Sequence, residues 1–249
     1  MDRKIAFKAL VGSENYHLAT EESDKDYKVF VIPTYSDLYF GKMYTKSISG
    51  NKVDEEFHDI RKVVNLWWKS NVNFVEVLFS TEIVIHEDKN IKRALDTLLA
   101  MKQDIAVMNL PYLYKACKGM FLSKSKNIEH GNSATTYLVD RYGYDSKSAM
   151  HAFRILDFIE RFAQNEFSDF EGAMKYDQQE REFMLAIKRG AYTKEEFTQL
   201  LKDKLKSFNE LEKIYIKQNT SEHIKKIMEG IIYEMTATSL RNELLLFNK

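Results

Sequence analysis

Ala9-Leu10-Val11-Gly12-Ser13 and, after a polar spacer of ten residues, Asp24-Lys25-Asp26-Tyr27-Lys28-Val29-Phe30-Val31-Ile32 are the stretch that decides the fold. The first apolar run ends at a Gly-Ser pair, and the second begins with two acids one residue apart. Side chains alternate across a strand, so we expect Asp24 and Asp26 to share one face, with Cα atoms roughly 6–7 Å apart. Their carboxylate oxygens suit a hard divalent cation such as Mg²⁺.

The Gly-Ser pair between the two runs predicts a phosphate-binding turn. Gly12 allows a tight turn and a close approach of backbone to ligand. Ser13 and the amides after it could bind a phosphate at the N-terminus of a short helix, which we expect over residues 13–20. Together with the two acids, the turn predicts a nucleotidyl-transfer site that uses a nucleoside triphosphate and Mg²⁺ or Mn²⁺.

A third acid is expected on another strand. Residues 52–58 alternate, with Asp54 and Glu56 on one face, and helical spacing begins at Asp59. Asp54 is expected to be the third metal ligand and to accept the proton of the attacking hydroxyl. Glu56 could replace Asp54 or act together with it. Arg61 and Lys62 open the helix, where they could bind nucleotide or form a solvated face.

The chain predicts an α+β fold. Strands are expected over 4–11, 27–33 and 52–58, and a loop or hairpin over 34–51. Residues 72–79 form a short apolar segment that could be a helix or a strand. Beyond about residue 88, apolar residues recur at helical spacing. The expected helices cover 90–106, 108–123, 131–140, 145–164, 178–189, 193–216 and 219–247. We therefore expect a small mixed-sheet catalytic domain over 1–90 and an all-helical domain over 91–249.

Composition limits the class of protein. Lys plus Arg and Asp plus Glu both number 37, so no global positive field recruits nucleic acid, although a local basic groove remains compatible. Cys117 is the only cysteine, which excludes a disulfide within the chain and favours a reducing compartment. No apolar run approaches the ~18 residues of a membrane span. The expected location is the cytoplasm, with no membrane partner.

One segment of the helical half carries several ligand-binding side chains. Lys147, His151 and Arg154 fall at i, i+4 and i+7, on one face of a helix. Such a face could bind a triphosphate, with two charges and one hydrogen-bonding ring. The alternative is a polar face bound to Asp157 or Glu160. Farther on, Lys188 could contact phosphate or RNA, or its segment could simply end a helix.

These segments resemble the DNA polymerase β-like nucleotidyltransferase superfamily. Residues 12–26, GSENYHLATEESDKD, resemble the pattern G-S-x-x-Y-G-L-A-T-P-x-S-D-x-D of a branch of predicted nucleotidyltransferases associated with RNA repair. His17 and Glu21 depart from it, inside the spacer. Residues 69–79 and the run RYGYDSKSAMHAFR over 141–154 resemble two further patterns of this branch.

The resemblance implies a polymerase β-like palm and a helical C-terminal domain that closes a nucleotide cleft. It implies an RNA end, such as that of a tRNA, as acceptor. Two alternatives stay open, namely transfer to a protein or small molecule and a non-catalytic nucleotide-binding regulatory module. The implied metal ligands are Asp24, Asp26 and Asp54, and the implied nucleotide-binding residues are Gly12, Ser13, Arg61, Lys62, Lys147, His151 and Arg154.

Overall fold

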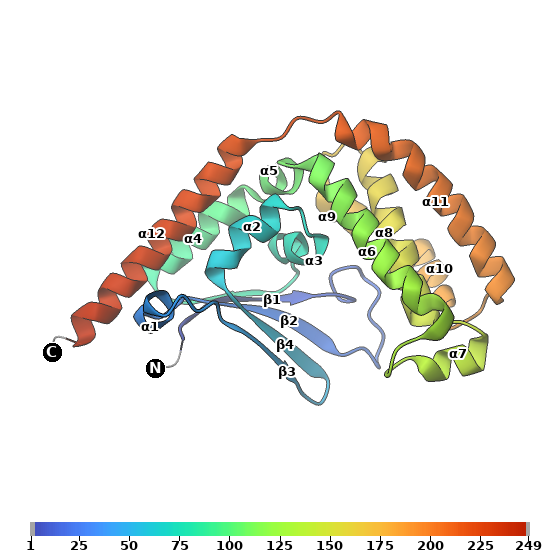
Figure 1. The fold of residues 1–249 in the computed structure, drawn as a ribbon, viewed down its shortest axis with the longest axis horizontal. Coiled ribbons are helices and arrows are strands. Elements are labelled where there is room, and N and C mark those ends of the chain that lie inside the picture. Colours follow the sequence, from blue (N-terminus) through green and yellow to red (C-terminus); the bar gives the residue numbers. More distant parts are fainter. Residues whose placement is uncertain (1–2, 248–249) are drawn as a thin grey trace. The chain divides into compact units, whose positions relative to one another are not determined.

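The chain forms two compact units in the structure, a computed structural model that describes residues 3–247 (Figure 1). The sheet unit contains the described residues up to Asn15, Ala19–Met108 and those from Thr220 onward. The helical unit contains Tyr16–Leu18 and Asn109–Asn219. The predicted α+β fold is confirmed. The compact units do not divide at residue 90, because residues 91–108 and the C-terminal helix belong to the sheet unit. The predicted division by role stays a prediction.

The sheet has five strands in the order β3-β4-β2-β1-β5. β2 and β4 run parallel, and the other neighbouring pairs are antiparallel. The three predicted strands are confirmed as β1, β2 and β4. The sequence did not predict β5, and the stretch expected as a loop or hairpin contains a short helix, α1, and β3, which forms a hairpin with β4. The bounds are β1 Ile5–Val11, β2 Lys25–Val31, α1 Tyr35–Tyr39, β3 Thr45–Ser49, β4 Val53–Asp59 and β5 Ile83–Ile85.

Aromatic side chains fill the space between the sheet and the helices after β4. The rings of Phe7 and Phe30 stack with centroids 4.4 Å apart. The Phe74 ring lies edge-on to His58 at 4.9 Å, and its carbonyl accepts a hydrogen bond of 2.9 Å from the Trp67 indole. Short helices after β4 cover this face of the sheet (Figure 1). These are η1 Ile60–Lys62, α2 Val63–Trp68, α3 Val72–Val75 and η2 Glu76–Phe79.

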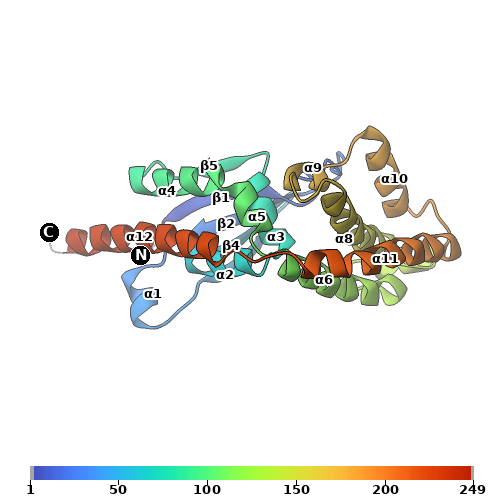
Figure 2. The same cartoon turned by 90° about the horizontal axis from the view of Figure 1, so that it is seen from above.

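Three further helices complete the sheet unit. One predicted helix, over 90–106, forms as two, α4 (Lys89–Ala100) and α5 (Lys102–Val107). The C-terminal helix α12 (Glu222–Phe247) lies beside α4, as both views show (Figures 1 and 2). Among the described residues, no helix is both long enough and apolar enough to cross a bilayer.

The helical unit is built around α8, which packs against α6, α9, α10 and α11. Its inner side is aromatic, with the Phe158 and Phe170 rings 5.0 Å apart. Thr193 and Glu196 form a capping box at the start of α11. The prediction ended α6 seven residues early and missed α9. The bounds are α6 Leu110–His130, α7 Thr136–Tyr142, α8 Ser146–Gln164, α9 Phe170–Met174, α10 Gln178–Lys188 and α11 Lys194–Ile216.

Candidate active site

Two of the predicted acids face each other across neighbouring strands. Asp26 of β2 and Asp54 of β4 are register partners in the parallel pair, so both side chains leave the same face of the sheet. Neighbouring strands lie about 4.8 Å apart. Like charges placed directly opposite are unfavourable. A divalent cation held between the two carboxylates would reverse that repulsion.

The Gly12 turn lies directly against this pair. Gly12 has φ +73°, in the left-handed region that favours glycine. A Cβ atom at this position would lie 3.0 Å from Oδ2 of Asp26. The Gly12 amide donates a hydrogen bond of 3.2 Å to Oε2 of Glu76. Glycine therefore lets the turn backbone approach the Asp26 carboxylate more closely than any other residue could.

The short helix predicted over 13–20 is wrong, because these residues form turns and irregular backbone. The buried Asn15 side chain donates to the Glu76 carbonyl at 3.3 Å and accepts from the Thr81 amide at 3.2 Å. His17 has φ +57°, which interrupts a right-handed helix. These long-range hydrogen bonds replace those that a helix would make. The half-buried Ser13 thus lies in a turn, and phosphate binding there would depend on turn amides.

Asp24 lies just outside the strand pair that carries the other two acids. It precedes the first residue of β2, and its side chain is exposed. Over residues 3–247, no three or more His, Cys, Asp or Glu side chains gather closely enough to hold a metal ion. Mg²⁺ is commonly bound by one or two protein carboxylates together with substrate phosphates. The Asp26–Asp54 pair fits that mode, and Asp24 stays a predicted third ligand.

Glu56, the alternative to Asp54, is held by other partners. It is the register partner of Lys28 and forms an ion pair with it. Nε2 of His58 lies 3.3 Å from its other carboxylate oxygen. His58 first, and then Lys28, lower the pKa of Glu56 to about 2, against the opposing effect of burial. The structure therefore places Asp54, and not Glu56, opposite Asp26.

Arg61 and Lys62 lie beyond the other end of β4. Asp54 and Asp59 are five residues apart, or about 17 Å along the strand. The Arg61 guanidinium binds the fully buried Asp59 carboxylate at 2.8 and 2.6 Å, and this partner raises the pKa of Arg61. Lys62 donates to the Thr45 hydroxyl. The structure does not bring this pair to the two carboxylates.

The predicted cationic face of the helical unit is present on α8. Lys147 is exposed, His151 is half-buried and Arg154 is buried. Burial, followed by the charges of Arg154, Lys124, Lys147 and Lys188, holds the pKa of His151 well below its ordinary value of 6.5. We call these five residues the cationic cluster. Burial and these four positive charges therefore favour the neutral form of the imidazole.

The alternative predicted for this face was binding to acids of the same helix. The carboxylates of Asp157 and Glu160 each accept a hydrogen bond of 2.8 Å from Lys204 of α11. For the segment of Lys188, the end of a helix is observed, because Gly190, two residues after α10, has φ +68°. Contact of Lys188 with phosphate or RNA stays a prediction.

Tyr16 is a residue that sequence reasoning missed. The Arg154 guanidinium lies 3.7 Å from the centre of its ring, a cation–π contact. Its carbonyl accepts a hydrogen bond of 3.3 Å from the Tyr176 amide, and the Tyr176 hydroxyl donates to Asp157 at 3.0 Å. No spacing in the sequence relates residue 16 to α8. The contact fixes the orientation of the arginine before any ligand binds.

Comparison with known proteins identifies the wider group to which these features belong. Residues 1–229 match the sequence model of the family RlaP, described as the RNA repair pathway DNA polymerase beta family. Among curated proteins, none matches the chain. The family match covers the paired acids, the glycine turn and the cationic cluster, and it supports the resemblance stated from the motifs.

Proposed function

The chain belongs to the RNA repair pathway DNA polymerase beta family, and we propose that it transfers a nucleoside monophosphate from a nucleoside triphosphate to the hydroxyl of an RNA end. The observation that carries this proposal is the in-register pairing of Asp26 with Asp54 beside the Gly12 turn. Two carboxylates on one face, next to a half-buried glycine turn, suit a metal-bound polyphosphate better than an uncharged substrate.

Asp26 and Asp54, joined by Asp24, would hold Mg²⁺ or Mn²⁺. A bound ion of this kind neutralises charge on the phosphoryl oxygens and lowers the pKa of an attacking hydroxyl. The carboxylate oxygens are of the hard type that these ions prefer. Asp54 would also accept the proton of the attacking hydroxyl.

The remaining residues would bind and orient the triphosphate. Ser13 and the amides after it would donate hydrogen bonds to phosphate oxygens, since the Gly12 amide already binds Glu76. Lys147 and Arg154 would supply positive charge, the arginine already oriented by Tyr16. His151, whose pKa is lowered first by burial and then by the neighbouring positive charges, would form hydrogen bonds without adding a charge.

Two observations bear on the acceptor. The family description favours RNA. The net charge of zero favours a protein or small-molecule acceptor, because enzymes that bind RNA by long-range attraction usually carry excess positive charge. Each kind of acceptor is therefore offered separately in the experiment.

The experiment is label transfer from each of the four α-labelled nucleoside triphosphates, with Mg²⁺ or Mn²⁺, to small RNA, to protein alone or to a small-molecule pool. The site variants are Asp26→Asn and Asp54→Asn, which keep side-chain size and remove charge. The matched control is Glu55→Gln, the neighbour of Asp54 on the opposite face, which forms an ion pair with Lys8.

We expect label in RNA with the wild-type chain and the Glu55→Gln variant, and a loss of at least 100-fold in both site variants. Label on protein or on a small molecule would show that this molecule, and not RNA, is the acceptor of the same nucleotidyl transfer. Nucleotide binding without any transfer would support a regulatory module. Full transfer by both aspartate variants would overturn the site.

A further inference from the structure

Exposed aromatic rings gather on α1 and the loop after it, in the sheet unit. Tyr39 is 75 % exposed and Phe40 is 64 % exposed, and their rings meet edge to face with centroids 5.0 Å apart. Together with the exposed Tyr35 ring they line a pocket of about 570 Å³, within the ~300–1,000 Å³ typical of ligand sites. Contiguous exposed apolar side chains mark an interaction site. The pocket and its rings suit a flat ligand such as a nucleobase.

Two lysines without a carboxylate partner lie beside these rings. The Lys42 ammonium lies 5.3 Å from the centre of the Phe40 ring. The Lys62 ammonium binds the Tyr44 carbonyl and the Thr45 hydroxyl. Over residues 3–247, no carboxylate lies within ion-pair distance of either lysine. Both ammonium groups are therefore available to a phosphate.

The arginines at this end of the sheet are already neutralised. Arg3 binds Asp37 at 2.6 Å, and Arg61 binds Asp59 at 2.6 Å. Glu243 of α12 lines the same pocket and opposes the two lysines. The surface is therefore only weakly positive, so stacking on the rings would supply more of the binding than long-range attraction. This balance agrees with the net charge of zero of the chain.

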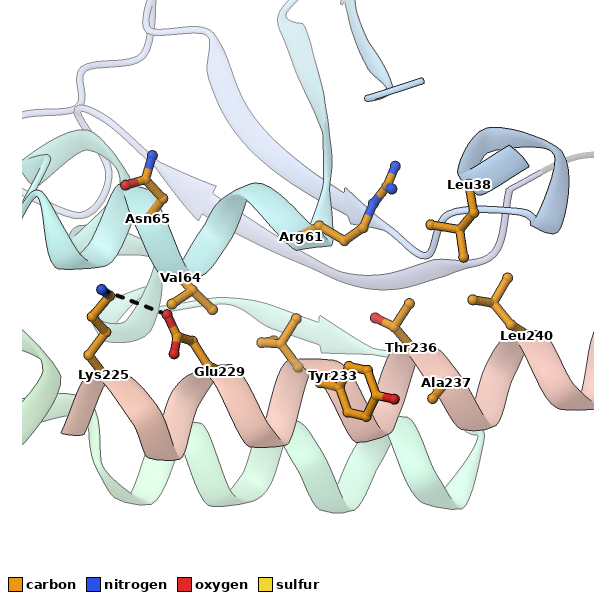
Figure 3. A pocket seen from close by; sticks show the side chains of 11 residues that line it. Leu38, Arg61, Val64, Asn65, Lys225, Glu229, Tyr233, Thr236, Ala237 and Leu240 are labelled. Carbon is orange, nitrogen blue, oxygen red and sulfur yellow. Dashed lines mark ion pairs between the residues drawn. The ribbon is translucent and has the colours of Figure 1, made fainter. Parts of the chain in front are cut away.

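The apolar groove between α12 and α2 differs in this respect (Figure 3). Figure 3 shows Lys225 paired with Glu229 on α12, and Arg61 on the facing wall. Among the described residues, each charged side chain that lines this groove has a partner of opposite sign. The exposed Tyr233 lines the groove as well. The groove thus offers an aromatic ring without an unpaired cation, which makes it a matched control.

β3 connects the end of the sheet near α1 with the proposed active site. Its alternation places Thr45, Ser47 and Ser49 on the face that carries Asp54, since Ser49 is the register partner of Asp54. All three hydroxyl residues are exposed. They extend over about 14 Å of strand, beginning at the hydroxyl that Lys62 binds. Hydroxyl and lysine side chains are common partners of nucleic-acid phosphates.

The surface defined here is called the α1 platform, and its residues are Tyr35, Tyr39, Phe40, Lys42 and Lys62. We propose that the α1 platform binds the single-stranded part of an RNA acceptor, with bases stacked on its rings and phosphates at its two lysines. Every base has a flat face, so such stacking tolerates many sequences. The β3 hydroxyls lead the strand toward Asp54. The choice of RNA rests on the proposed function, and Lys62 thereby binds the acceptor and not the triphosphate.

The test measures RNA binding without catalysis. A fluorescein-labelled single-stranded RNA of about twelve nucleotides, within the site sizes known for such proteins, is titrated with the full chain in EDTA without nucleotide. Tyr39→Ala and Phe40→Ala should each raise the Kd about tenfold, as expected for the loss of one stacked base. Both side chains are exposed, so the urea midpoint should not change. Tyr233→Ala, which removes a ring that is 74 % exposed on α12, should leave the Kd unchanged.

Salt dependence tests the two lysines separately from the rings. Lys42→Gln and Lys62→Gln should each reduce the slope of log Kd against log salt concentration by about 0.7, the value for one phosphate contact on a single strand. Lys92→Gln, exposed on α4, is the matched control and should keep the wild-type slope. A blunt-ended duplex of the same sequence should bind more weakly, because its bases are not free to stack on the rings.

Label transfer separates this inference from the proposed function. The two aromatic variants should need more RNA for half-maximal transfer. At saturating RNA, every variant of α1 or the loop after it should transfer label at the wild-type rate. RNA binding that depends on the rings, without any transfer, would support the platform and refute the proposed function. No RNA binding by the wild-type chain, an equal Kd in both aromatic variants, or label on a protein acceptor that these variants lose would overturn the platform.

Discussion

Substitution of Gly12 by alanine tests whether the turn backbone must approach the Asp26 carboxylate. An L-residue in the left-handed conformation costs about 1–2 kcal/mol. The new Cβ atom would also lie 3.0 Å from Oδ2 of Asp26, closer than ordinary van der Waals contact. Alanine at this position should therefore strain the turn and displace a predicted metal ligand.

The expected loss of stability is about 1–2 kcal/mol from the backbone alone, or a fall in Tm of about 2–8 °C for a chain of this size. The matched control is Gly41→Ala. Gly41 has φ +61°, but a Cβ atom there would have no neighbour within 4 Å. Both variants should lose similar stability in urea unfolding, since both adopt the same strained conformation.

Activity should separate the two variants. Label transfer by the Gly12→Ala variant should fall at least tenfold at temperatures where the chain stays folded, and the concentration of Mg²⁺ needed for half-maximal transfer should rise. Transfer by the Gly41→Ala variant should match wild type. Equal transfer by both variants at equal stability would refute the argument that the turn positions Asp26.

Three further predictions concern titrating and paired groups. The Arg3 guanidinium lowers the pKa of the buried Asp37 carboxyl from 3.8 to about 2. This pair should therefore contribute about 2 kcal/mol to the free energy of unfolding, a contribution that is lost as pH falls from about 4 to 2. Asp37→Asn should remove that part of the acid dependence in urea unfolding. The pKa of His151 lies well below 6.5 in the folded chain, so the unfolded chain binds the proton first and stability should fall as pH drops below about 6.5. Ring NMR signals should still report a neutral imidazole at pH 6. A charged ring at that pH would contradict the effect assigned to the cationic cluster. Lys204→Met should lower the free energy of unfolding in urea by about 1–3 kcal/mol, because it leaves the carboxylates of Asp157 and Glu160 without their shared cation. An unchanged unfolding midpoint would show that these two ion pairs do not stabilise the fold.

Local patterns in the sequence predicted much of the fold because they carry local information. Alternation over 52–58 predicted β4, and helical spacing predicted α8 and α11 to within about two residues. The pairing of β4 with β2 depends on contacts between distant segments, so periodicity alone left open which acid would face Asp26. The register resolves this in favour of Asp54 over Glu56.

The errors have the same physical origin. Residues 13–20 have a helix-compatible sequence, but the hydrogen bonds of Asn15 to the segment 76–81 hold them as turns. The contact of Arg154 with Tyr16 and the effect of Lys124 on His151 join segments more than 25 residues apart. No local spacing rule reports such contacts. The short strand β5 was missed because three residues carry too little pattern.

The most direct measurement asks whether a divalent cation binds where Asp26 faces Asp54. Mn²⁺ titrated into the isotope-labelled, nucleotide-free chain broadens NMR signals near its binding site. We predict that the amides of residues 12–13, 24–26 and 53–55 broaden first, and that Asp26→Asn/Asp54→Asn removes the effect, whereas Glu55→Gln preserves it. Broadening confined to other residues, or unchanged in the double variant, would contradict the proposed site.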